Sequence, residues 1–189
     1  MKVKDKVCVV TGAAGGIGEA IARRYAKEGA KGVVVADRDG ARLQAVANDI
    51  KGLAVVGDVG KEADVKHLIA EAERRFGPVD VFFSNAGIGR GGHEDATDKD
   101  WADSWAIHVM AHVYAARALV PGMLARKSGY LLNTASAAGL LASMGSAPAM
   151  RSMLVSTACG QSTEIAMPRS PYWMERCSAS ATPACLVTP

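Results

Sequence analysis

Three glycines near the amino terminus have a spacing that suits phosphate binding. The stretch TGAAGGIG contains Gly12, Gly16 and Gly18, and it follows the apolar run at 6–10. In a strand–turn–helix unit, the first glycine permits a sharp turn, the second lets the backbone approach a pyrophosphate, and the third lets the helix pack against the sheet. The free N–H groups at the start of that helix then face the phosphates. Ile17 lies between the second and third glycines and is predicted to line the same site.

An acidic residue follows about twenty positions later, the interval expected for a dinucleotide site. Asp37 comes directly after the apolar run at 32–36, where a carboxylate accepts hydrogen bonds from the ribose hydroxyls of an adenosine. The same carboxylate repels a 2′-phosphate, so the sequence predicts NAD as the cofactor, with NADP less favoured. Arg38 points the other way, because an arginine binds a 2′-phosphate, but we interpret it as a solvated loop charge.

These residues need a scaffold in which buried strands alternate with amphipathic helices. Short β-branched runs indicate buried strands, and apolar residues three and four positions apart indicate helices. The predicted strands are 6–10, 32–36, 53–56, 79–84 and 130–134, and the predicted helices are 17–28, 42–50, 62–76 and 97–127, the last broken or capped near Pro121. This alternation predicts an α/β fold of the Rossmann type, a doubly wound parallel sheet with helices on both faces.

The alternation stops after residue 143, and the composition changes soon afterwards. The last lysine is Lys127 and the last aspartate is Asp103, whereas three of the four cysteines lie near the carboxyl terminus, at Cys159, Cys177 and Cys185. We therefore predict an NAD-binding Rossmann domain over 1–148, incomplete at its carboxyl end, and an atypical tail over 149–189. We interpret this tail as disordered or as the product of a shifted reading frame.

The overall composition describes an ordinary globular protein. The 189 residues are 49% hydrophobic with a formal net charge of +3, which gives no reason to expect a nucleic-acid partner. No apolar run reaches the length of a membrane span, and no signal-peptide pattern opens the chain. The cysteine spacings indicate neither a metal site nor a redox dithiol. We expect a cytoplasmic protein with no metal and no membrane partner.

Together with the glycines and Asp37, several further motifs resemble the short-chain dehydrogenase/reductase family. They are Asp58-Val59 after the third predicted strand, Asn85-Ala86-Gly87 after VDVFFS, and SAAGLL beginning at Ser136. The likeness extends from residue 1 to about residue 148. It implies that Asp58 and Val59 hold the adenine, and that Asn85, Ala86 and Gly87 line the cofactor near the nicotinamide ribose. From the residues alone, Asn85 could equally be a structural cap of the sheet.

The family resemblance also implies a catalytic set of four residues. Ser136 matches the serine that polarises the substrate carbonyl. The position of an asparagine that holds a proton-relaying water is His108, which can also hold a water. The positions of the tyrosine acid and its lysine partner are Ala149 and Met153, and neither can exchange a proton. A tyrosine needs such a cation nearby because its ordinary pKa is about 10.

The resemblance implies an NAD-dependent oxidoreductase acting on a small alcohol or ketone, in a family whose members form homo-oligomers. Three hypotheses concern this particular chain. It is an out-of-frame or shortened product of such an enzyme, with doubtful turnover; a catalytically inactive dinucleotide-binding module; or an enzyme with an altered catalytic set that uses His108 as its acid.

Overall fold

The computed structural model describes residues 2–90 and 95–136, and within them a single parallel sheet has the strand order β3-β2-β1-β4-β5. The strands are β1 (Val7–Thr11), β2 (Gly32–Asp37), β3 (Leu53–Val56), β4 (Val81–Ser84) and β5 (Tyr130–Asn133). The helical segments are α1 (Gly16–Lys27), α2 (Gly40–Asp49), α3 (Glu62–Phe76), α4 (Asp98–Trp105), the π-helical turn η1 (Ala106–Met110) and α5 (Ala111–Ala125). The predicted Rossmann-type fold is confirmed.

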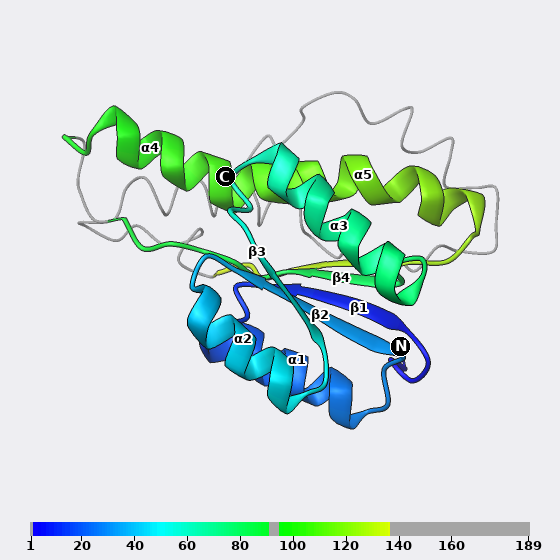
Figure 1. Ribbon diagram of the computed structural model, residues 1–189. Coiled ribbons are helices and arrows are strands. Elements are labelled where there is room, and N and C mark those ends of the chain that lie inside the picture. Colours follow the sequence, from blue (N-terminus) through cyan, green and yellow to red (C-terminus); the bar gives the residue numbers. More distant parts are fainter. Residues whose placement is uncertain (1, 91–94, 137–189) are drawn as a thin grey trace, which may run out of the picture.

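Helices cover both faces of the sheet. Helices α1 and α2 lie on one face, and α3, α4 and α5 lie on the other (Figure 1). In β1, Val7 and Val9 belong to the core beneath α3 and α5, whereas Cys8 and Val10 belong to the core beneath α1 and α2. Every residue of this strand is buried, which explains why the sequence shows a continuous apolar run rather than an alternating one.

The order of the strands reverses between β1 and β4. Strands β1, β2 and β3 proceed outward in one direction, and the chain then crosses to place β4 on the other side of β1. Because the register pairs Val10 with Phe83, the ends of β1 and β4 lie side by side. The connections that leave these two ends turn to opposite faces, and the crevice between them is where ligands bind in open α/β sheets.

The predicted break in the long helix is wrong. Pro121 lies inside α5, which continues to Ala125, and the irregular turn is instead η1, at Ala106–Met110. Pro121 and Arg117, four residues before it, are both exposed. Proline has no N–H to donate to the carbonyl of Arg117. That carbonyl can face solvent instead, because this part of α5 is exposed and close to the end of the helix.

Strand β4 also begins two residues later than predicted. The carboxylate of Asp80 accepts a hydrogen bond from the N–H of Val7 at 2.9 Å, so a side chain replaces the backbone partner at this end of the strand.

No helix among the described residues is long and apolar enough to cross a membrane.

Candidate functional site

The Gly-rich turn packs tightly against the loop that follows β4. Gly12 has a φ of +66°, and a Cβ placed on it would lie 2.8 Å from the Cα of Ala86. A Cβ on Gly18 would lie 2.1 Å from the carbonyl oxygen of Gly12. Both positions therefore require glycine, the first for its left-handed backbone and the second for the approach of α1 to the turn.

The amino terminus of α1 is open to solvent and has no side-chain cap. Its N-cap is Gly15, which supplies no side-chain hydrogen bond, and nothing lies within 4 Å of a Cβ built on Gly15 or Gly16. Ile17, beside them, is 63% exposed. The first N–H groups of a helix need acceptors from outside it, so this end of α1 fits a phosphate.

Asp37 fastens the Gly-rich turn to the end of β2. Its Oδ2 accepts a hydrogen bond from the N–H of Ala14 at 3.1 Å. Its Oδ1 accepts from the N–H groups of Arg38 at 2.7 Å and Asp39 at 3.2 Å. An ionised carboxylate has about four acceptor positions, so Asp37 keeps capacity for a ligand hydroxyl while its orientation is fixed.

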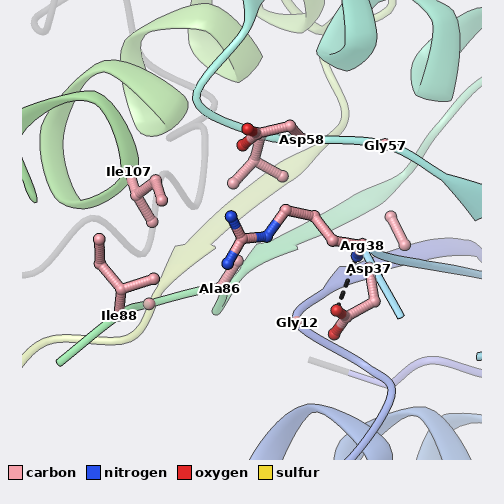
Figure 2. Close-up of a pocket in the computed structure, with 11 residues that line it drawn as sticks. Gly12, Asp37, Arg38, Gly57, Asp58, Ala86, Ile88 and Ile107 are labelled. Atoms are coloured by element: carbon pink, nitrogen blue, oxygen red, sulfur yellow. Dashed lines mark hydrogen bonds between the residues drawn. The ribbon is translucent and has the colours of Figure 1, made fainter. Parts of the chain in front are cut away.

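A small pocket of about 80 Å³ lies between the ends of β1, β2 and β4 and the loop after β3. It brings together six of the predicted site residues, namely Gly12, Asp37, Asp58, Val59, Ala86 and Gly87. The side chain of Arg38 extends across this pocket from the Asp37 side toward Ala86 (Figure 2). Ile88 and Ile107 also line it, and sequence reasoning missed them because an isolated isoleucine carries no chemical signal.

A second, wider groove of about 460 Å³ continues from this pocket toward β5. It is lined by Gly12, Ala14, Gly15, Ile17, Asp37, Asp39, Arg42, Asn85, Ala86, Gly87 and Thr134. The groove therefore runs past the start of α1 and over the ends of β1 and β4.

Asn85 connects the ends of three strands. Its Nδ2 donates to the carbonyl oxygen of Thr11 at 3.1 Å and more weakly to that of Gly12 at 3.4 Å. Its Oδ1 accepts from the hydroxyl of Thr134 at 2.8 Å. Asn85 thus has the structural role that the sequence left open, and it lines the wider groove as well.

Thr11 supports the same loop from the end of β1. Its Oγ1 accepts hydrogen bonds from the N–H groups of Asn85 at 2.9 Å and Ala86 at 3.1 Å. The threonine is buried, and it was missed in the sequence because a buried hydroxyl at a strand end has no distinctive spacing.

Asp58 is held in place by its own loop. Its N–H donates to Asp64 Oδ2 at 2.9 Å, and its Oδ1 accepts from the N–H of Gly60 at 3.0 Å. Val59 follows it and packs partly against the core beneath α3 and α5. Both residues line the small pocket.

Two histidines lie one helical turn apart behind the pocket. His108 is 5% exposed, and its Nε2 accepts a hydrogen bond from the N–H of Ile88 at 3.1 Å. His112 Nδ1 lies 2.7 Å from Ser84 Oγ. Burial lowers the pKa of His108 below its usual 6.5 and, with a contribution from His108, lowers that of His112 to about 4.

The remaining predicted catalytic positions lie at or beyond the edge of the described chain. Ser136 is half-buried and follows the end of β5 by three residues, outside both of the pockets described above. Ala149, Met153 and the tail at 149–189 lie outside the described residues. Among the described residues, no group of three or more His, Cys, Asp and Glu side chains is placed to hold a metal ion.

Comparison with known proteins yields a consistent set of relatives. A model of the short chain dehydrogenase family matches residues 6–148. An uncharacterized oxidoreductase of Listeria innocua is 39% identical over 153 residues, which are 78% of this chain and 61% of that protein. This chain therefore spans about three fifths of that relative.

Two solved structures have the same fold. A short chain dehydrogenase/reductase from Burkholderia phymatum, in complex with NAD, superposes with a TM-score of 0.80 at 31% identity, covering 84% of this chain and 59% of that one. An L-sorbose reductase from Gluconobacter frateurii, complexed with NADPH and L-sorbose, superposes with a TM-score of 0.79 at 33% identity, covering 84% and 64%. With a match over residues 6–148 and this agreement in fold, the chain belongs to the short chain dehydrogenase family.

Proposed function

We propose that this chain binds NAD in the groove at the carboxyl edge of its sheet, as part of an oxidoreductase that acts on an alcohol or ketone. The proposal rests on the carboxylate of Asp37 at the end of β2. This carboxylate is oriented by a hydrogen bond from the N–H of Ala14. It lines both the small pocket and the wider groove. A fixed negative charge here favours a ribose with free hydroxyls over one that carries a 2′-phosphate.

The residues around the groove divide the binding of a dinucleotide between them. The uncapped start of α1, with Gly12, Gly16, Ile17 and Gly18, would face the pyrophosphate. Asp58 and Val59 would enclose the adenine, and Asn85, Ala86 and Gly87 would form the wall toward the nicotinamide. A bound nicotinamide supplies the hydride chemistry, while the protein contributes orientation and polarisation.

The sequence gives less support for proton transfer than for nucleotide binding. By the family resemblance, Ser136 would polarise a carbonyl oxygen, but Ala149 and Met153 stand where the same resemblance implies a tyrosine and a lysine. Without a positioned acid, general acid–base catalysis that contributes about 10²–10⁴-fold is lost. We therefore expect turnover by this chain to be slow, with 1–148 acting as the nucleotide-binding domain and 149–189 as a tail outside it.

The second candidate is a dinucleotide-binding module without turnover, and the same two residues favour it. The hypothesis that His108 replaces the acid has less support, because its Nε2 accepts a hydrogen bond from Ile88 and has no proton to give in that state. These candidates differ in activity rather than in binding.

Hydride transfer separates the candidates. The purified chain is incubated with NAD and a panel of secondary alcohols, and the absorbance of the reduced nicotinamide is followed over hours. Slow turnover that persists in His108→Ala supports the proposed oxidoreductase. Saturable NAD binding with no reduced product supports the binding module. Turnover that is abolished in His108→Ala at a concentration of NAD that still saturates the variant supports the altered catalytic set. Failure to bind NAD contradicts all three.

A further inference from the structure

His108 connects the long helix to the wall of the nucleotide pocket. It lies in η1, the one π-helical turn among the described residues, and only 5% of its surface is exposed. Its Nε2 accepts the N–H of Ile88 at 3.1 Å. A Cβ built on Gly87 would lie 3.4 Å from the same Nε2, so the ring packs directly against this wall.

The segment that His108 holds is part of the pocket itself. Ala86, Gly87 and Ile88 line the small pocket, and Ile88 lies across it from Asp37 (Figure 2). Ile107, next to His108 in the chain, lines it as well. At the other end of the segment, Thr11 and Asn85 fix the loop by hydrogen bonds. After Gly87, the hydrogen bond from the N–H of Ile88 to His108 Nε2 holds the segment in place.

This hydrogen bond exists only when Nε2 carries no proton. A neutral imidazole has one donor and one acceptor nitrogen, whereas the imidazolium has two donors. Protonation would place an N–H at Nε2 directly against the N–H of Ile88. Two N–H donors facing each other cannot form a hydrogen bond, so the contact between His108 and Ile88 would be lost.

We propose that His108 is a positioning residue whose neutral form holds Ile88 in the wall of the pocket, so that its protonation releases the wall and weakens nucleotide binding. The inference rests on the proposed binding of NAD. The affinity for NAD is then constant above pH 6.5 and falls at lower pH. The fall is at most about tenfold per pH unit, the limit for uptake of a single proton.

Other titratable groups on the adjoining elements are few among the described residues. His112 lies one turn along the helix and interacts with Ser84. Asp58, on the loop next to η1, accepts the N–H of Gly60. Arg90, after the wall, forms ion pairs with both Asp100 and Asp103 of α4. His112 also interacts electrostatically with His108, and the side chain of Arg38 extends across the pocket toward Ala86 (Figure 2). Single substitutions therefore test these groups one at a time.

The first test measures NAD affinity by calorimetry between pH 5 and pH 8.5 for three proteins, with circular dichroism to verify folding at each pH. His108→Gln keeps an acceptor oxygen near the position of Nε2 but does not titrate in this range. His112→Gln is the control: it removes the neighbouring titratable ring, which contacts Ser84, and leaves the bond from Ile88 to His108 in place. We expect falling affinity below pH 6.5 in the wild type and in His112→Gln, and constant affinity in His108→Gln.

The outcomes separate the inference from the function on which it rests. Constant affinity in the wild type, or the wild-type fall retained in His108→Gln, overturns the role of His108 while leaving NAD binding intact. Absence of NAD binding at every pH contradicts the proposed function and, with it, any control of nucleotide affinity.

A second measurement needs neither a variant nor a nucleotide. In an NMR titration of the wild type, the amide resonance of Ile88 should move with the same midpoint as the ring of His108. An Ile88 amide that stays unchanged while the ring of His108 titrates would overturn the inference.

Discussion

At the scale of single residues, the central feature is that Asp37 has two tasks. It braces the Gly-rich turn through the N–H of Ala14, and it presents its remaining acceptor capacity to the groove. Sequence spacing predicted the second task, because an acid after a buried strand is a recognisable pattern. It could not predict the first, since the partner is a backbone N–H and any residue at position 14 would provide it.

Substituting this carboxylate should change the choice of nucleotide. Asp37→Asn removes the negative charge with little change in shape, so repulsion of a 2′-phosphate is relieved. We expect the preference for NAD over NADP to fall by about tenfold or more, equivalent to about 1.4 kcal/mol. Competitive calorimetric titrations with the two nucleotides measure the ratio. Asp49→Asn, at the far end of α2, is the matched control, and an unchanged ratio in Asp37→Asn would contradict this role.

The side chain of Asn85 ties the loop after β4 to the ends of β1 and β5. Asn85→Ala removes the donors to Thr11 and Gly12 and the acceptor for Thr134. Leaving these partners unsatisfied should lower the free energy of unfolding by about 1–3 kcal/mol. Urea denaturation measures the change. The exposed Asn133 at the end of β5 offers a comparison, because Asn133→Ala should change stability by less than about 0.5 kcal/mol; equal effects of the two substitutions would refute the assignment.

At the scale of elements, the approach of α1 to the Gly-rich turn sets the geometry of the groove. Gly18 allows this contact because the carbonyl oxygen of Gly12 occupies the space where a Cβ would lie. The start of α1 is uncapped because its N-cap, Gly15, has no side chain. Two different glycines therefore set the position of the helix and leave its first N–H groups available.

A methyl group should be enough to displace this helix. In Gly18→Ala, the new Cβ would lie 2.1 Å from a backbone oxygen, and overpacking of this kind costs about 1–3 kcal/mol. Thermal unfolding should show the loss. Gly15→Ala is the control, since its backbone is extended, with a φ of −177°, and nothing lies within 4 Å of the added methyl. Equal melting temperatures for Gly18→Ala and the wild type would contradict the account.

The sequence predicted the strands and most helices well, and the exceptions have physical reasons. Buried parallel strands leave continuous apolar runs, so all five were located, with β4 placed two residues early. The helix break was misplaced because Pro121 is a strong local signal, although its exposed site tolerates it. The π-helical turn at Ala106–Met110 contains neither glycine nor proline. It is defined by hydrogen bonding that a periodicity of 3.6 residues does not reveal.

At the scale of the whole molecule, buried histidines link stability to pH. The pKa of His112 falls from 6.5 to about 4 on folding, mainly through burial. Between these values the unfolded chain binds more protons than the folded one, so stability decreases as the pH falls from 6.5 to 4. Above pH 6.5 the histidine is neutral in both states and contributes no pH dependence.

Acid should therefore destabilise the protein in a defined interval. The shift of His112 corresponds to a loss of up to about 3 kcal/mol of unfolding free energy between pH 6.5 and pH 4. Urea denaturation at several pH values measures it. His112→Gln should reduce the slope in this interval, and a wild-type stability that stays level or rises toward pH 4 would be incompatible with a buried neutral imidazole.

The most direct test of the central claim is a titration of the purified chain with NAD, followed residue by residue in NMR spectra. The account predicts saturable binding, with the largest shifts at Gly12, at the start of α1, at Asp37 and at Asn85 to Ile88. No saturation at millimolar NAD, or shifts confined to other surfaces, would contradict the claim that this edge of the sheet binds the dinucleotide.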